Sequence, residues 1–135
     1  MNNAERVSEF HRAVGNIDPS APTPPGEAVL SLRRTLIEEE QAEVLEAFSR
    51  FQAASLEHKE AEFHALVHEL TDLLYVTYGA LVAFGVEPEG VFAEVHRANM
   101  QKATGPRRED GKQLKPEGWR PADVSGVLAE QNRHR

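Results

Sequence analysis

A run of glutamates lies inside a stretch that has the apolar spacing of an α-helix. Five of the nine residues from 38 to 46 are glutamates, namely Glu38, Glu39, Glu40, Glu43 and Glu46. At about 100° per residue, Glu40 and Glu43 point into the apolar sector of this helix, and Glu39 lies on its border. Carboxylates on an apolar stripe are rarely left unpaired. The pattern therefore predicts that Glu40 and Glu43 bind a cation, whereas Glu38 and Glu46 face solvent.

A second acidic pair lies on the next predicted helix. Glu69 stands within an apolar face, and Asp72 follows three residues later at the edge of that face, since residues three or four apart share one side of a helix. If the two helices pack antiparallel, as a short connection favours, four or five carboxylates meet and repel one another. A hard divalent cation removes this conflict, and ligands that are all oxygen favour Mg²⁺ or Mn²⁺.

Other kinds of metal or phosphate site fit the sequence less well. A ferritin-like di-iron centre needs Glu-x-x-His on two helices, and the sequence contains no such motif. His64 and His68 have the i, i+4 spacing of a zinc chelate but lie off the carboxylate stripe, so His68 at most orients Asp72. There is no Walker loop and no Gly-x-Gly-x-x-Gly motif. A glycine-rich phosphate cradle is thus not expected.

Length and charge favour one domain with two oppositely charged blocks. A chain of 135 residues with a formal charge of −7 is long enough for one core. Residues 38–46 carry five acids and no base, while residues 97–120 are rich in lysine and arginine. A divalent cation suits the first block and a polyanion suits the second. The acidic balance argues against a nucleic-acid polymer as a partner.

Composition also bounds the compartment. The sequence has no cysteine, which excludes disulfides and thiolate metal sites. No apolar run approaches the roughly 20 residues that span a bilayer, and the N-terminus lacks a signal-peptide pattern. We therefore expect a cytoplasmic protein without a membrane partner.

The elements that must position the acids are all predicted to be helical. Apolar periodicity and the placement of Gly and Pro predict helices at about residues 3–14, 27–53, 56–84, 89–103 and 121–131. Ser55 is expected to cap the third of these. We divide the domain, 1–135, into an N-terminal helix with a proline-rich arm (1–26), a helical core (27–105), and a basic loop with a last helix (106–135). The fold class is all-α, a bundle of four to five helices.

Several motifs resemble one superfamily. Glu39-Glu40-x-x-Glu43 followed by Glu69-x-x-Asp72 is similar to the E-E-x-x-E…E-x-x-D signature of the MazG-like all-α nucleoside triphosphate pyrophosphohydrolases, a superfamily that includes dimeric dUTPases and phosphoribosyl-ATP pyrophosphohydrolase. Further stretches resemble its bacterial MazG-like branch: Glu9-Phe10-His11, the turn at Arg34, Tyr75-Val76-x-Tyr78-Gly79, Val91-Phe92-Ala93-Glu94-Val95-His96-Arg97-x-Asn99, and Asp110-Gly111-Lys112-x-x-Lys115-Pro116-x-x-Trp119-x-Pro121-x-Asp123. Because Glu38, Glu39 and Glu40 are consecutive, the signature could begin at Glu38 or at Glu39. Helical phase decides for Glu39, since Glu38 points away from the apolar sector.

The resemblance implies a chemistry for these acids. Superfamily members hydrolyse nucleoside triphosphates to monophosphate and pyrophosphate with Mg²⁺. The metal ligands implied here are Glu39, Glu40, Glu43, Glu69 and Asp72. The first four of these form the catalytic set, in which we expect Glu39 to be the base that activates water.

The resemblance also implies substrate-binding residues and partners. Phosphate contacts are expected from Asn99, Lys102, Lys112 and Lys115; Trp119 either stacks on a base or pins the loop, and His11 reaches a base from the N-terminal arm. A housecleaning enzyme that favours dUTP, a phosphoribosyl-ATP pyrophosphohydrolase and a non-catalytic helical binding module stay open as functions. Apolar residues spread round the second long helix beyond one partner face, which predicts a homodimer or a dimer of dimers.

Overall fold

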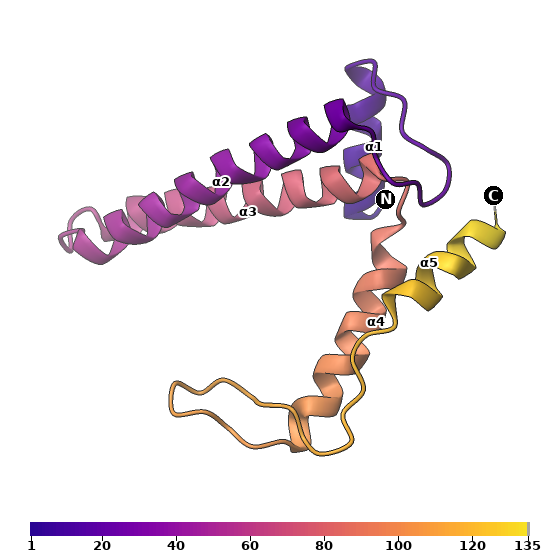
Figure 1. The fold of residues 1–135 in the computed structure, drawn as a ribbon. Helices are drawn as coiled ribbons and strands as arrows, with labels where there is room; N and C mark the ends of the chain where they lie inside the picture. Colours follow the sequence, from indigo (N-terminus) through magenta and orange to yellow (C-terminus); the bar gives the residue numbers. More distant parts are fainter. Residues whose placement is uncertain (135) are drawn as a thin grey trace.

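The computed structural model describes residues 1–134 (Figure 1). Its helices are α1 (Asn3–Ala13), α2 (Glu27–Ala53), α3 (Lys59–Ala83), α4 (Pro88–Gln101), the short 3₁₀ helix η1 (Lys102–Thr104) and α5 (Val124–Arg133). No strand occurs within these residues, and one isolated β-bridge joins Arg107 to Gln113. The predicted all-α class is confirmed, with five α-helices near the predicted positions.

Helices α2 and α3 form a long antiparallel hairpin (Figure 1). Its seam buries Val44 and Ala47 of α2 and Leu66 of α3. The prediction that Ser55 caps α3 is wrong, because the chain makes one more turn before the helix begins at Lys59. In that turn the Ser55 carbonyl accepts the His58 N–H at 3.0 Å, and the two side chains meet at 3.0 Å.

Helix α1 and the proline-rich segment after it pack against the C-terminal end of α3. Val7 and Val82 are buried together, with Tyr78 against them. Gly15 leaves α1 with a φ of +85°, and the segment then crosses the end of α3, where the Thr23 N–H donates to the Phe84 carbonyl at 2.8 Å. A Cβ at Gly85 would overlap the Ala21 carbonyl oxygen, so this close crossing requires glycine.

Helices α4 and α5 form a second pair that turns away from the hairpin (Figure 1). Pro88 occupies the first turn of α4, as predicted. The helical segments Lys59–Ala83 and Pro88–Thr104 meet at a bend of 114°. Within residues 1–134 no single helix has the length and hydropathy of a membrane span, and these two segments have them only when counted together across the bend.

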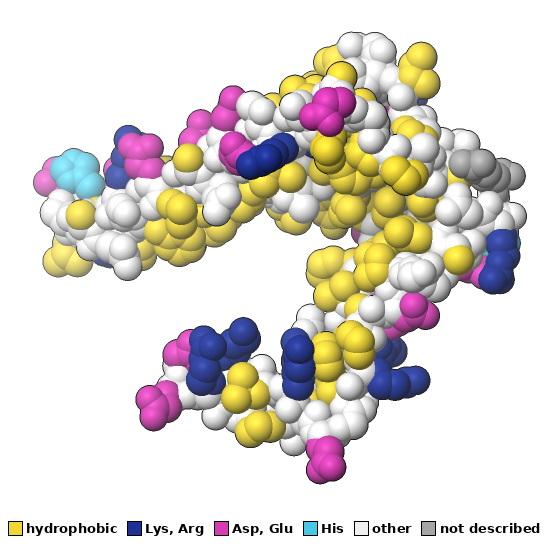
Figure 2. Space-filling view, viewed as in Figure 1, with side chains coloured by type: hydrophobic (Ala, Val, Ile, Leu, Met, Phe, Trp, Pro, Cys, Tyr) yellow, Lys and Arg dark blue, Asp and Glu magenta, His cyan; other side chains and the backbone are white. Residues whose placement is uncertain are grey.

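The hairpin and α4 leave apolar side chains uncovered. Figure 2 shows hydrophobic side chains gathered on the hairpin and on the part of the chain below it, on both sides of a hollow. Among the exposed large hydrophobic residues are Val67, Leu70 and Leu74 of α3 and Phe92 and Met100 of α4. A monomeric domain ordinarily exposes apolar residues singly, so this number of exposed apolar side chains on α3 and α4 is unusual for a chain without a partner.

Candidate metal centre and active site

Three carboxylates meet across the seam of the hairpin. Glu40 and Glu43 lie one turn apart on α2, and Glu69 reaches them from α3. Each offers a carboxylate oxygen, and these three atoms lie within 4.8 Å of one another. The structure thus brings together three of the five acids predicted to bind metal. We call Glu40, Glu43 and Glu69 the acidic cluster.

Burial and like charge disfavour the ionised form of two cluster members. Burial is the largest cause that raises the pKa of Glu40, followed by a hydrogen bond with Glu43 and by the negative charges of Glu43, Asp72 and Glu69. The pKa of Glu69 is raised by the same kinds of cause, burial first, and is lowered slightly by His68. A bound cation would reverse this cost, because opposite charge favours the ionised carboxylate.

The donor set fits a hard divalent cation. Oε2 of Glu40 and Oε2 of Glu69 are buried and have no hydrogen-bond partner within the described residues. Buried acceptors without a donor are costly, and oxygen ligands alone suit Mg²⁺ or Mn²⁺ rather than a soft metal. The acidic cluster therefore has the oxygen ligands of a metal site and two buried carboxylate oxygens that a bound cation would pair.

The two remaining predicted ligands lie at the margin of the cluster. Asp72 is near enough to raise the pKa of Glu40 and of Glu69, and its Oδ2 lies 3.3 Å from Nε2 of His68. Glu39 is exposed beside the cluster. Its neighbour Glu38 is engaged on the outer face, where Nε of Arg34 lies 2.5 Å from its carboxylate.

The raised pKa values predict a pH dependence of the metal-free protein. Between the ordinary value of 4.5 and the raised values, the folded state binds more protons than the unfolded state. The free energy of unfolding therefore falls as the pH rises through this window. Urea unfolding in chelator should show a gain in stability as the pH is lowered from above the raised pKa values toward 4.5. In Glu69→Gln that gain should be smaller; an equal gain would contradict the assignment to the cluster.

Metal binding should raise thermal stability. A ligand that binds only the native state adds RT ln(1 + [L]/Kd) to the free energy of unfolding, and here it also removes the repulsion among the cluster carboxylates. The melting temperature in millimolar Mg²⁺ should exceed the melting temperature in chelator. The free energy of unfolding should rise by about 2.7 kcal/mol when the free ion is at 100 times its Kd. Glu69→Gln should narrow the difference while stabilising the metal-free protein. Equal melting temperatures in the wild type would argue against a metal site.

A basic cluster forms at the far end of α4. Nε1 of Trp119 donates to the Ala98 carbonyl at 2.7 Å, which pins the loop to α4. Nζ of Lys102 and Nζ of Lys115 lie 5.1 and 4.7 Å from the centre of the indole ring, within cation–π range. Lys102, Lys115 and Trp119 thus lie together, and the structure supports the pinning role of Trp119.

The other two phosphate-binding candidates lie in the same part of the chain. Asn99 is exposed on α4, and Lys112 is exposed in the loop. Figure 2 shows basic side chains of this lower part of the chain facing the hairpin across the hollow. Helix α4 and the loop after it turn away from the hairpin that carries the acidic cluster (Figure 1), and no ion pair joins the two clusters within residues 1–134.

His11 lies at a buried junction between α1, α2 and α3. It is 2% exposed, and its Nδ1 lies 2.9 Å from Oδ2 of Asp18. A Cβ at Gly79 would lie 3.1 Å from Nη1 of Arg33 and 3.5 Å from Nε2 of His11, so Gly79 leaves room for both side chains. This position gives His11 a packing role and leaves it little surface for the predicted contact with a base.

The predicted site residues do not include Arg33, whose charged side chain is buried on α2. It is 8% exposed, and its Nε lacks a hydrogen-bond partner within the described residues. The spacing of seven residues between Arg33 and Glu40 places both on one face of α2, and this periodicity was the signal available in the sequence. An arginine stays charged when buried, so Arg33 places a positive charge at the junction beside Gly79 and His11.

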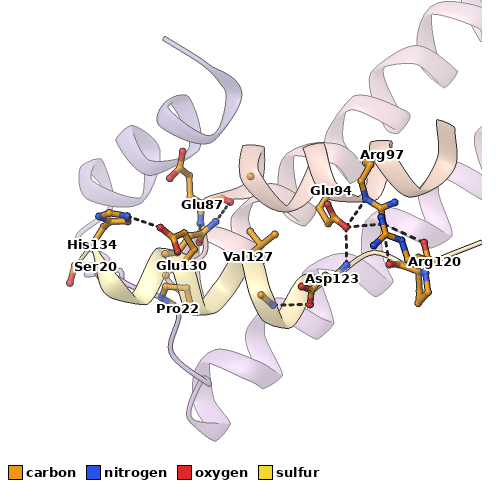
Figure 3. Close-up of a pocket in the computed structure, with 15 residues that line it drawn as sticks. Ser20, Pro22, Glu87, Glu94, Arg97, Arg120, Asp123, Val127, Glu130 and His134 are labelled. Carbon is orange, nitrogen blue, oxygen red and sulfur yellow. Dashed lines mark hydrogen bonds and ion pairs between the residues drawn. The ribbon is translucent and has the colours of Figure 1, made fainter. Parts of the chain in front are cut away.

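A separate cavity lies between the N-terminal arm, α4 and α5 (Figure 3). Its volume is about 900 Å³. Glu94 on its wall accepts hydrogen bonds from Nε of Arg97 at 2.9 Å and from the Asp123 N–H at 3.0 Å. The Asp123 N–H and then Arg97 lower the pKa of Glu94. This network ties the C-terminal segment to α4, and none of the predicted site residues lines the cavity.

Comparison with known families adds one finding. A family model described as phosphoribosyl-ATP pyrophosphohydrolase matches residues 7–99, which is more than half of the chain. The match includes all five predicted metal ligands and ends before Lys102 and the rest of the basic cluster. No curated protein matches the chain significantly.

Proposed function

Because the chain belongs to the phosphoribosyl-ATP pyrophosphohydrolase family, we propose that it cleaves a nucleoside triphosphate between the α- and β-phosphates. The family lies within the MazG-like all-α superfamily, and its members are hydrolases of phosphoanhydride bonds. The products would be a nucleoside monophosphate and pyrophosphate. The observation that supports this most is the convergence of Glu40, Glu43 and Glu69 within 4.8 Å across the seam.

The metal would be held by the acidic cluster together with Asp72. Mg²⁺ is the ion we propose, with Mn²⁺ as a substitute, because every donor is a carboxylate oxygen. When bound, the ion supplies charge neutralisation and polarisation of phosphate oxygens. The carboxylates would hold it at the seam, where one oxygen each of Glu40 and Glu69 is buried.

Glu39 would act as the general base. It is exposed beside the cluster, so solvent water has access to its carboxylate. Glu39 would take a proton from a water molecule whose oxygen attacks the α-phosphorus. The bond from the α-phosphorus to the bridging oxygen then breaks, and pyrophosphate leaves with both bonding electrons. Lys102 and Lys115 would neutralise charge on the leaving pyrophosphate.

A second copy of the chain would complete the site. Each chain has exposed apolar residues such as Leu70 and Phe92, and covering them would stabilise a dimer. No lysine forms an ion pair with the acidic cluster within residues 1–134, and the end of α4 that carries the basic cluster turns away from the hairpin (Figure 1). Charge complementarity favours a homodimer in which the basic cluster of each copy meets the acidic cluster of the other.

Two substrates deserve comparison in one assay. A preference for dUTP would make the enzyme a housecleaning nucleotidase, whereas the description of the matching family model favours phosphoribosyl-ATP. A panel of ribo- and deoxynucleoside triphosphates and phosphoribosyl-ATP should be incubated with the protein and Mg²⁺. Pyrophosphate and orthophosphate release should be measured separately.

Release of pyrophosphate without orthophosphate would support cleavage at the α-phosphorus. The substrate with the highest kcat/KM would then decide between the two roles. Orthophosphate as the first product would contradict the proposed bond. Metal-dependent nucleotide binding without any product would instead identify a non-catalytic helical binding module.

A further inference from the structure

One basic side chain contacts the inward acids of the hairpin. Nε2 of His68 lies 3.3 Å from Oδ2 of Asp72, one helical turn further along α3. Among Glu40, Glu43, Glu69 and Asp72, only Asp72 has a basic side chain within ion-pair distance in residues 1–134. His68 also lies near Glu69, whose pKa it lowers. It is therefore beside two of the proposed metal ligands without belonging to the acidic cluster.

Asp72 needs such a partner more than the cluster members do. Its side chain is 39% exposed, whereas Glu40 and Glu69 each have a carboxylate oxygen enclosed by the seam. An exposed aspartate is free to rotate, and a ligand that must be ordered on binding loses affinity for its metal. Contact with His68 limits that rotation because both residues lie on one helix face.

We propose that His68 is a positioning residue for Asp72. A hydrogen bond from Nε2–H to Oδ2 of Asp72 would restrict the carboxylate and leave its other oxygen free to bind the cation. Outer partners of this kind typically change metal affinity 10–100-fold. The His68 side chain is 71% exposed, so we expect its loss to change metal affinity by about tenfold, the lower end of this range. The inference rests on the proposed function, because it assumes a metal at the acidic cluster.

The same helix provides a matched control. His64 and Glu60 repeat the i, i+4 pairing, with Nε2 of His64 3.8 Å from Oε1 of Glu60. Both members are exposed, and Glu60 does not belong to the acidic cluster. Replacing His64 removes an imidazole from the same face of α3, one turn from His68, and leaves every proposed metal ligand and its contacts unchanged.

Calorimetric titration of the 135-residue chain with Mg²⁺ tests the proposal. His68→Ala should weaken binding about tenfold, while His64→Ala should stay within about twofold of the wild type. His68→Gln should recover most of the affinity, because a glutamine amide nitrogen takes nearly the place of the imidazole Nε2. The melting temperature in chelator should be unchanged in all three variants.

Kinetics separate positioning from a general structural defect. His68→Ala should need about tenfold more Mg²⁺ for half-maximal rate, yet reach a kcat near that of the wild type when Mg²⁺ saturates. Wild-type affinity in His68→Ala, equal losses in both alanine variants, or no recovery in His68→Gln would each overturn the proposal. A wild-type protein that binds no Mg²⁺ would overturn the proposed metal-dependent function as well, which keeps the two failures distinct.

Discussion

Glu39→Gln should lower kcat by about 10²–10⁴-fold, the contribution that a general base typically makes. Glu38→Gln should change kcat by less than about threefold, as surface substitutions usually do. The two residues are adjacent and chemically identical, so only their helical phase separates them. Glu39 borders the inward sector of α2, whereas the Glu38 carboxylate is held by Arg34 on the outer face.

Substrate affinity is the control for this pair. The carboxylates of the acidic cluster and of Asp72 remain in Glu39→Gln, so KM should change far less than kcat. Steady-state kinetics of both variants at saturating Mg²⁺ would measure the split. If Glu38→Gln is the inactive variant, or if both behave alike, the register of the acids on α2 is wrong.

Mixing two inactive variants should restore activity if the site is shared between copies. Glu43→Gln should lose at least 10²-fold, because charge stabilisation by a bound ion contributes several kcal/mol. The double variant Lys102→Ala/Lys115→Ala should lose a comparable factor, since hydrogen bonds to charged groups contribute about 1.5–3 kcal/mol each. After subunit exchange at equal amounts, half of the dimers are mixed and have one intact site of two. The expected rate is about a quarter of the wild-type rate.

A matched mixture distinguishes a shared site from one that each chain forms alone. The triple variant Glu43→Gln/Lys102→Ala/Lys115→Ala should be mixed with the wild type in equal amounts. A shared site leaves intact sites only in wild-type dimers, so about a quarter of the rate remains. A site within one chain leaves about half. No recovery in the first mixture together with half the rate in this one would contradict the shared site.

The sequence alone determined the helices and the phase of the acids on them. The predicted bounds of α2, residues 27–53, agree with the structure, and Glu38 is ion-paired on the outer face as its phase predicted. Both are local properties. Apolar periodicity, proline at the first turn of α4 and glycine after α1 act within one or two turns of chain, so neighbouring residues suffice to predict them.

The terminal turns were less predictable. Helix α3 begins at Lys59 rather than after Ser55, and α5 spans Val124–Arg133 rather than 121–131. Helix ends depend on which of several polar groups captures the last free N–H or C=O groups. In α5 the Asp123 side chain accepts the Gly126 N–H, while its own N–H is taken by Glu94. That contact joins positions far apart in the sequence.

The tertiary structure decided which of the predicted site residues meet. Glu69 reaches Glu40 and Glu43 only because α3 folds back on α2 in one particular register, and two-helix registers depend on packing along the whole seam. His11 shares one face of α1 with Ala4 and Val7, and it is the packing of that face against α3, together with the contact with Asp18, that buries it. The bend between α3 and α4 directs the end of α4, with the basic cluster, away from the hairpin (Figure 1). The phase of the acids follows from the residues of one helix. Which acids face one another, whether His11 is buried and how far the basic cluster lies from the hairpin all follow from contacts between helices. The sequence of one helix does not encode those contacts by itself.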